Sequence, residues 1–354
     1  MHSAARVGGS GDVMRLALFN GPGALAVEHG EIPTPGEREV LVRVAACGVC
    51  GSDRAIFAGN HPSAVPVVLG HEFSGTVVEC GALVTGLETG ARVTVDPNIV
   101  CGRCRYCRRG WINHCERLTA LGIAIPGGYA EYSLVPDTNV YTIQDSTSFD
   151  AAAMVEPLAC CVHGIEQASV RLGDVVVILG AGPIGLLLAQ LARLRGAGSV
   201  VCVDPIGSRR ELARTLGVDE ATTADPEVVK EAVVSITDGM GADVVLESSG
   251  QTGAAQLAID LVRSGGVVVW FGVCPQDEHL SVSPFHVNDR ELTVRGSNIN
   301  PFTHQTALTL IERGRVRVTE LISDHIGLDE LGVTLGDARR YVGKVIVHPE
   351  TDAL

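Results

Sequence analysis

The feature that most constrains this fold is a glycine-rich turn between an apolar strand and an apolar helix. Residues 175–185 read VVVILGAGPIG, which places Gly180, Gly182 and Gly185 in the spacing G-x-G-x-x-G. The first glycine allows a tight turn, the second lets the backbone approach a pyrophosphate, and the third permits close packing of helix on strand. The turn therefore predicts an α/β domain with a doubly wound parallel sheet that binds a dinucleotide.

A carboxylate at the end of the next strand indicates which dinucleotide binds. Asp204 lies 19 residues after Gly185, where it can accept hydrogen bonds from the adenosine ribose and would repel a 2′-phosphate. We therefore expect NAD; NADP stays the alternative because Arg209 follows closely enough to reach a phosphate. Pro183 suits the first turn of the helix, whose N-terminus faces the phosphates. The predicted cofactor-binding residues are Gly180, Gly182, Pro183, Ile184, Gly185, Asp204 and Arg209.

The pattern of predicted strands and helices changes along the chain, which indicates two domains in 354 residues. Up to about residue 150, short β-like runs alternate with Pro/Gly turns, which is typical of a mostly β, barrel-like domain without long helices. From about residue 157, β-branched strands alternate with Ala/Leu-rich helical stretches, which favours a parallel sheet covered on both faces. The predicted boundaries are a leader at 1–13, a first domain at 14–156, a dinucleotide-binding domain at 157–296, and a return to the first domain at 297–354, with a helix at 302–313 and strand-like ends at 316–322 and 344–347.

Four cysteines in one short stretch predict a metal site. Cys101, Cys104, Cys107 and Cys115 form C-x2-C-x2-C-x7-C, a spacing that lets four thiolates meet around one tetrahedral Zn²⁺. A closed shell of four thiolates leaves no position for a substrate, so the predicted role is structural. Free or disulfide-paired thiols and an iron–sulfur cluster are the alternatives, although the fourth cysteine lacks the ferredoxin spacing.

A second group of metal-ligating residue types is scattered over three segments. They read CGVCGSD at residues 47–53, GHEFSG at 70–75 and MVEPLAC at 154–160. Each segment alone is ambiguous, because a single histidine beside an apolar strand is more often a structural residue than a ligand.

Taken together and in this order, GVCGSD, GHEFSG, the four-cysteine loop, EPLAC and GAGPIG resemble the zinc-dependent medium-chain alcohol and polyol dehydrogenases. The resemblance runs from about residue 14 to residue 347. It implies a GroES-like catalytic domain joined to a Rossmann domain, an active site in the cleft between them, and a homodimer or homotetramer.

The resemblance also implies a catalytic zinc site. Cys50, the cysteine immediately before the G-S-D segment, and His71 would be two of its ligands. The third would be Glu156 or Glu72, since relatives resembling sorbitol dehydrogenase use a carboxylate and water. An open position on such an ion would take the substrate oxygen and lower its pKa.

Three further positions bear on the transfer of the proton that the substrate hydroxyl loses. By resemblance, Ser52 would carry the proton away from the substrate oxygen, and Asp53 would fix the tautomer and orientation of His71. In many relatives the relay ends at a histidine five residues after the zinc-binding cysteine. Here that position is Ala55, so the exit of the relay is unassigned.

Composition excludes several partners. The net charge of −14 would repel a nucleic-acid backbone or an anionic membrane, and the longest apolar runs have the length of strands. The first residues, MHSAARVGGSGDV, contain no apolar stretch of a secretory signal, so we expect a cytoplasmic protein with reduced cysteines.

These expectations describe an NAD- and zinc-dependent oxidoreductase that interconverts a secondary alcohol or a polyol-, sugar- or cyclitol-like substrate with its ketone. Two alternatives remain. One is an NADPH-dependent carbonyl or enoyl reductase without catalytic zinc, against which Cys50, His71 and Glu156 argue. The other is a catalytically silent nucleotide-binding protein of the same fold, whose only support is the missing relay histidine.

Overall fold

The computed structural model describes residues 13–337 and 340–350, and it divides the chain into two compact units. The first unit holds the described residues up to Glu156, together with Leu308–Arg313 and those from Val318 onward. The second holds Pro157–Ala307 and Gly314–Arg317. Of the predicted leader, residues 1–12 lie outside the described residues, and Val13 already opens a strand.

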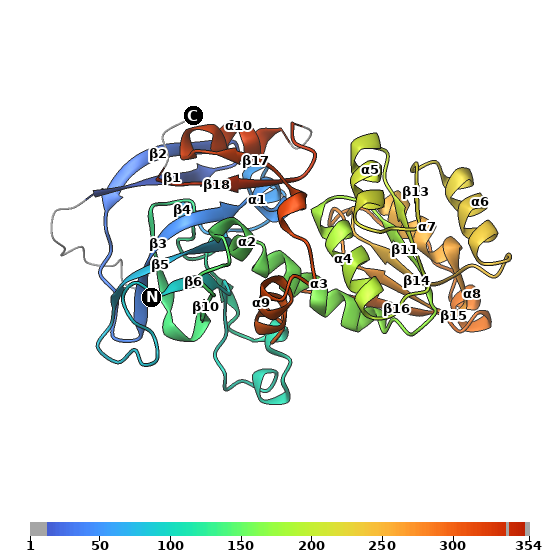
Figure 1. Ribbon diagram of the computed structural model, residues 1–354, viewed down its shortest axis with the longest axis horizontal. Helices are drawn as coiled ribbons and strands as arrows, with labels where there is room; N and C mark the ends of the chain where they lie inside the picture. Colours follow the sequence, from blue (N-terminus) through green and yellow to red (C-terminus); the bar gives the residue numbers. More distant parts are fainter. Residues whose placement is uncertain (1–12, 338–339, 351–354) are drawn as a thin grey trace. The chain divides into compact units, whose positions relative to one another are not determined.

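The first unit is mostly β, as predicted. Its sheets have the orders β2-β1-β4, β10-β6-β5-β3-β18-β17 with β9 on β3, and β7-β8. The strands are β1 (Val13–Gly21), β2 (Ala24–Glu31), β3 (Glu39–Gly48), β4 (Val67–Val68), β5 (Glu72–Cys80), β6 (Arg92–Val95), β7 (Asn98–Ile99), β8 (Thr119–Ala120), β9 (Tyr132–Pro136), β10 (Val140–Thr142), β17 (Ile322–Ile326) and β18 (Lys344–Val347). Strands β17 and β18, red in Figure 1, return to the blue strands that begin the chain.

Helices are short within the first unit. They are α1 (Gly51–Phe57), α2 (Phe149–Ala153) and α10 (Leu331–Gly336), with single 3-10 turns at Cys107–Arg109, Ile112–His114, Asp137–Asn139, Thr319–Leu321 and Leu328–Glu330. Two longer helices cross the boundary: α3 (Val155–Ala168) starts in the first unit, and α9 (His304–Glu312) ends in it.

Strand β3 is the centre of the first unit. It is rich in β-branched residues, and Val40, Val42 and Val44 are fully buried in the core. It pairs with β5, β9 and β18, all antiparallel. At its end, Gly48 lies opposite Glu72 on β5 and opposite Ile346 on β18. The residues that follow β3 are therefore fixed next to the residues that begin β5 and β18.

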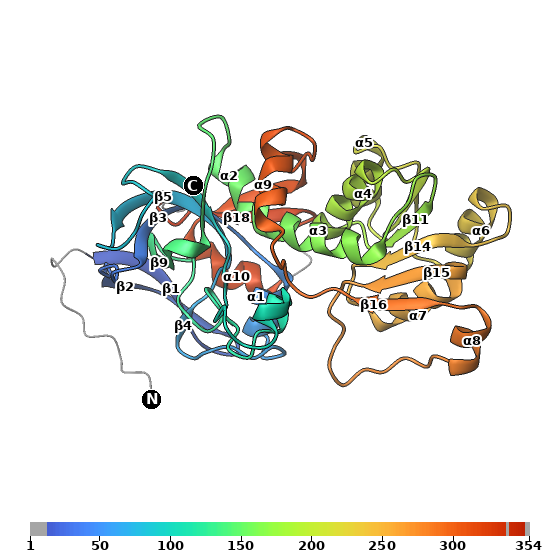
Figure 2. The same cartoon turned by 90° about the horizontal axis from the view of Figure 1, so that it is seen from below.

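The second unit contains the predicted parallel sheet, with six strands in the order β13-β12-β11-β14-β15-β16. Its elements are β11 (Val175–Leu179), α4 (Pro183–Leu194), β12 (Ser199–Val203), α5 (Gly207–Thr215), β13 (Glu220–Thr222), α6 (Pro226–Ile236), β14 (Ala242–Glu247), α7 (Thr252–Leu261), β15 (Val262–Trp270), α8 (Pro284–Asp289) and β16 (Thr293–Gly296). Helices α4 and α5 cover one face and α7 the other (Figure 2). The strand order reverses between β11 and β14, where a doubly wound sheet binds ligands.

The return segment differs from the prediction. The return begins at Leu308 instead of residue 297, and the predicted strand over 316–322 is wrong, because β17 starts only at Ile322. Within this segment, the side chain of Gln190 on α4 holds the backbone of Arg317, and a 3-10 turn occupies Thr319–Leu321. The amide nitrogen of Gln190 donates to the carbonyl of Arg317 (3.0 Å) and its oxygen accepts from the N–H of Arg317 (2.8 Å). Both backbone groups are thus taken by α4 and cannot join a strand ladder.

The close contact of β3 and β5 generates a stability prediction. A Cβ on Gly75 would lie 2.0 Å from the carbonyl oxygen of Arg43, so Gly75→Ala should destabilise the protein by about 2 kcal/mol or more. Gly253, in the first turn of α7, has open space around it, and Gly253→Ala should be neutral or stabilising by up to about 1 kcal/mol. Urea unfolding of both variants checks this; a Gly75→Ala protein as stable as its parent would contradict the packing described.

Candidate metal centres and cofactor site

The pairing of β3 with β5 brings three candidate ligands together. Cys50 follows β3, His71 precedes β5, and Glu72 is the first residue of β5. One ligand atom from each lies within 4.8 Å of the other two, and both His71 and Glu72 are buried. A side chain at Gly48 would prevent this, since its Cβ would lie 2.2 Å from the Glu72 carboxylate.

Asp53 holds the other side of the His71 ring. Its Oδ1 lies 3.3 Å from His71 Nδ1, while its Oδ2 accepts hydrogen bonds from the N–H of Cys50 (2.9 Å) and the hydroxyl of Tyr129 (2.7 Å). Burial opposes ionisation of Asp53, but His71 and these hydrogen bonds outweigh it and lower the pKa of its carboxyl. Asp53 also sits at the third position of α1, where it caps the helix. The carboxylate is therefore ionised and firmly placed.

Two neighbouring side chains change the pKa of His71. Burial disfavours the imidazolium, but Asp53 and Cys50 together raise the pKa of His71 well above its ordinary value. The hydroxyl of Ser52, in the first turn of α1, lies 3.3 Å from His71 Nε2. Since Asp53 faces Nδ1, Nε2 is the nitrogen left toward Cys50 and Ser52, and a metal bound there would displace its proton.

Two further charged groups lie beside this cluster. Lys344, the first residue of β18, forms a buried ion pair with the carboxylate of Glu72. Burial disfavours its ammonium, but Glu72 outweighs this and raises the pKa of Lys344. Glu156, at the start of α3, is buried nearby but lies outside the close group of three. Burial raises the pKa of Glu156 to about 7, with His71 opposing the shift and Glu72 adding to it.

The donor set of Cys50, His71 and Glu72 fits zinc. A thiolate, an imidazole and a carboxylate are the three ligand types that Zn²⁺ takes, and three protein ligands leave a fourth position open. The other buried groups complete the surroundings: Asp53 orients the imidazole, and Lys344 balances the carboxylate.

The four-cysteine loop is folded for metal binding. Backbone N–H groups donate to the sulfurs: Cys101 to Cys115 (3.3 Å), Cys104 to Cys101 (3.3 Å), and Cys107 to Cys104 (3.5 Å). The four sulfurs lie within 4.8 Å of one another. Such hydrogen bonds stabilise thiolates, which are the metal-binding form.

Neighbouring thiols in this loop oppose one another's ionisation. Backbone N–H groups of Cys107 and Glu116 lower the pKa of Cys104 to about 6. In contrast, desolvation and the neighbouring thiols raise the pKa of Cys107 to about 12. A divalent ion at the centre removes this repulsion, so the loop fits a tetrahedral zinc. The neighbouring Arg105 pairs with Glu116 at 3.0 Å.

The glycine turn of the second unit has the predicted geometry. Gly180 directly follows β11 and has φ of +103°, which favours glycine. Gly182 is the N-cap of α4, and Pro183 and Ile184 form its first turn. A Cβ on Gly185 would lie 1.8 Å from the carbonyl oxygen of Gly180, so the helix can approach the strand only with glycine there. No side chain caps the N-terminus of α4, so the N–H groups of its first turn are available to an anion.

Asp204 is anchored at the end of β12. Its Oδ2 accepts from the N–H of Ala181 (2.9 Å) and its Oδ1 from the N–H of Ile206 (2.8 Å), and the residue is buried. Arg209 Nη1 lies 3.7 Å from Asp204 Oδ2, and Arg210 donates to the Asp204 carbonyl oxygen at 2.7 Å. The structure thus places a carboxylate and a guanidinium side by side at the predicted ribose position.

Sequence reasoning missed Lys344 and Tyr129. Both are buried, and both reach the metal cluster from strands or loops far away in the sequence. The available signal for Lys344 was a lysine opening the apolar run KVIV, because a charge in a buried strand needs a partner. Tyr129 has no comparable local signal.

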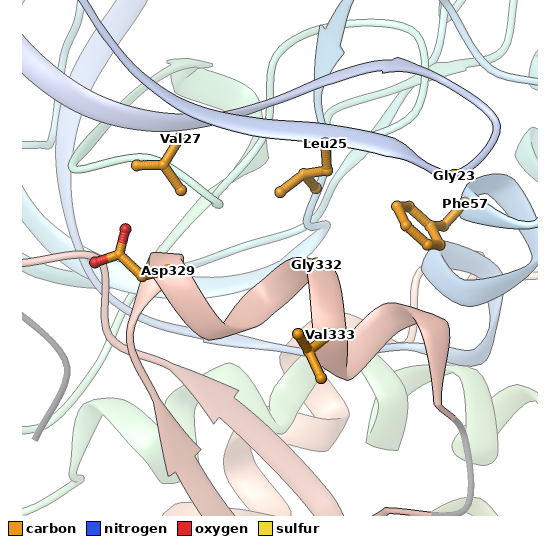
Figure 3. Close-up of a pocket in the computed structure, with 7 residues that line it drawn as sticks. All are labelled: Gly23, Leu25, Val27, Phe57, Asp329, Gly332 and Val333. Carbon is orange, nitrogen blue, oxygen red and sulfur yellow. The ribbon is translucent and has the colours of Figure 1, made fainter.

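A shallow hollow of about 460 Å³ lies elsewhere in the first unit (Figure 3). It is lined by Gly23, Leu25, Val27, Phe57, Asp329, Gly332 and Val333. The carboxylate of Asp329 pairs with Arg15 at 2.7 Å, and the other lining groups are apolar or glycine. This hollow offers no metal-ligating group beyond that paired carboxylate, so we do not assign the chemistry to it.

Within residues 13–337 and 340–350, every helix is too short or too polar to cross a bilayer.

Comparison with known proteins agrees with this geometry. The profile of the alcohol dehydrogenase GroES-like domain matches residues 36–145, and that of the zinc-binding dehydrogenases matches residues 183–313. A sorbitol dehydrogenase of Halalkalibacterium halodurans is 38% identical over 88% of this chain and 91% of its own. A D-arabitol-phosphate dehydrogenase of Enterococcus avium is 36% identical over 84% of this chain and 86% of its own.

Solved structures agree as well. A chain of Sinorhizobium meliloti 1021, described as a zinc-binding dehydrogenase and solved with NADP, is 41% identical with a TM-score of 0.91, covering 96% of this chain and 100% of that one. The two matching domain profiles, the identity with relatives over most of the chain, and the shared fold lead to one conclusion. The chain belongs to the zinc-dependent medium-chain alcohol and polyol dehydrogenase family.

Proposed function

We propose that this chain oxidises a secondary alcohol of a polyol-like substrate to the ketone, and catalyses the reverse reduction, with NAD as hydride acceptor. The observation that carries the proposal is the buried group of Cys50, His71 and Glu72, in a chain that also contains a dinucleotide-binding turn. Three ligands that leave one coordination position open are typical of catalytic zinc, whereas four thiolates are typical of structural zinc.

In this proposal the first unit holds the catalytic zinc through Cys50, His71 and Glu72. Glu72 is preferred over Glu156 as the third ligand because only Glu72 lies in the close group. A zinc ion held there would lower the pKa of the substrate hydroxyl, and NAD held at the glycine turn of the second unit would supply the hydride acceptor. Asp53 fixes the orientation of His71, and Tyr129 and the N–H of Cys50 fix Asp53 in turn.

Ser52 is the proposed proton carrier. Its hydroxyl lies beside His71 Nε2, the ring nitrogen turned away from Asp53, and can accept the proton that the substrate hydroxyl loses. Ala55, later in the same helix, cannot continue the relay, so water is the proposed next acceptor.

The substrate class is proposed from the relatives, whose names specify sorbitol and D-arabitol-phosphate.

The preference for NAD is proposed from the Asp204 carboxylate, which would repel a 2′-phosphate. A second candidate is an NADP-dependent enzyme, which is favoured by Arg209 beside Asp204 and by the relative solved with NADP. We also propose a cytoplasmic homodimer or homotetramer.

The catalytic zinc is tested by Cys50→Ser. Because a ligand is lost, turnover of a panel of alcohols, polyols and cyclitols should fall more than about 100-fold. NADH binding, measured by fluorescence, should stay nearly unchanged. The matched control is Cys47→Ala, which removes a buried thiol outside the ligand group and should retain turnover and zinc. Normal turnover in Cys50→Ser, or equal loss in both variants, would contradict the assignment.

The cofactor preference is tested by two substitutions. Asp204→Ser should lower the ratio of kcat/KM for NAD over NADP by about tenfold or more, since the repulsion of the 2′-phosphate is removed. Arg209→Ala should leave NAD use nearly intact. An unchanged ratio in Asp204→Ser, or a native enzyme that already prefers NADP and loses this preference in Arg209→Ala, would favour the second candidate.

The cysteine loop is tested by Cys104→Ser. Zinc binding and folding are coupled at such sites, so this variant should lose the zinc held by the loop and unfold at lower temperature or assemble poorly. Metal analysis and thermal unfolding measure both effects. A fully stable, normally assembled variant would argue against a structural zinc.

A further inference from the structure

A third group of metal-ligating side chains lies in the first unit, apart from both predicted zinc sites. Asp150 is on α2, His325 is on β17, and His348 directly follows β18. One ligand atom from each lies within 4.8 Å of the other two. The proposed reaction uses none of the three, and their positions in the sequence gave no sign of their proximity.

The distances in this group match those around a metal ion. His325 Nδ1 lies 3.0 Å from His348 Nε2, and the Asp150 carboxylate lies 3.4 Å from His348 Nε2 and 3.7 Å from His325 Nδ1. Ligand atoms at about 2.1 Å from a tetrahedral ion are separated by about 3.4 Å. The three observed distances bracket this value. The two distances to the carboxylate are long for charge-assisted hydrogen bonds, and the 3.0 Å contact of the two imidazole nitrogens is a hydrogen bond that a bound ion would replace.

The tautomer of His348 is also the one that a metal requires. Its Nδ1 lies 2.9 Å from the carbonyl oxygen of Ala45, which can only accept, so Nδ1 carries the hydrogen. The lone pair is then on Nε2, the nitrogen that faces Asp150 and His325. Metal-binding histidines typically donate their other N–H to a carbonyl or carboxylate in this way.

Accessibility and charge indicate the kind of ion. The side chains of Asp150 and His348 are about one-quarter exposed and that of His325 is 47% exposed, so an ion can enter from solvent. One carboxylate and two neutral imidazoles carry a net charge of −1, which favours a divalent cation. Two imidazole nitrogens favour zinc, copper or nickel over magnesium or calcium.

We propose that Asp150, His325 and His348 form a surface site for a divalent transition-metal ion, with zinc as the ion tested. The site connects α2 to the ends of β17 and β18, so an ion there would cross-link these two C-terminal strands to α2. The proposal is independent of the proposed dehydrogenase activity.

The test is a zinc titration of the purified enzyme with its resident zinc in place. Equilibrium dialysis against zinc at controlled free concentration, followed by metal analysis, should show about one additional zinc bound per chain. In His325→Gln and in His348→Gln, the affinity for this additional zinc should fall at least about tenfold. The matched control is His29→Gln, an exposed histidine on β2 of the same unit, which should behave like the native enzyme.

A third variant, Asp150→Asn, retains the size of the side chain but replaces one carboxylate oxygen by an NH2 group and loses the charge, and it should also bind the additional zinc at least about tenfold more weakly. Circular dichroism without added zinc tests whether each variant is folded. Substitution of His325 should disturb packing least, because its side chain is about half exposed. The absence of additional zinc in the native enzyme, or equal binding in the native enzyme and folded His325→Gln, would overturn the proposal.

Discussion

The pairing of β3 with β5 is the constraint on which the candidate active site depends. Gly48 at the end of β3 faces Glu72 at the start of β5, so Cys50 and His71 are held next to each other by backbone hydrogen bonds. A slip of one residue would turn every side chain of β5 to the opposite face. The metal cluster is therefore built on the paired ends of two core strands, which fix the positions of its ligands.

The buried charges around this cluster are arranged in compensated pairs. Asp53 faces His71, and Lys344 faces Glu72, so each of these four groups has an opposite partner. Removing one partner would leave the other buried and unpaired, which typically costs about 3–5 kcal/mol. These pairs explain why Asp53 and Lys344, which are outside the candidate ligand set, are needed to place His71 and Glu72, which belong to it.

Local patterns in the sequence predicted local structure well. The four cysteines lie within 15 residues, and Gly180 and Gly185 belong to one turn. Their spacing in the sequence is therefore enough to predict that they lie close together in the fold. Contacts between distant segments left no such pattern. Lys344 contacts Glu72, and Gln190 holds Arg317, only because distant segments fold together. The second contact lies within residues 316–322, where the predicted strand was wrong.

The same reason explains what the sequence left open in the site. Glu72 and Glu156 are equivalent as residue types, and only the folded chain separates the carboxylate within the close group from the one outside it. The group of Asp150, His325 and His348 is drawn from three distant segments and could not be found from spacing.

The central claim is that Cys50, His71 and Glu72 hold a metal ion with an exchangeable fourth position. Cobalt in place of zinc at this site tests it most directly, because the visible absorption of Co²⁺ responds to a change of ligand. Addition of the alcohol substrate together with NAD should shift these bands, in proportion to substrate bound. A spectrum that stays unchanged while substrate is being oxidised would contradict the account.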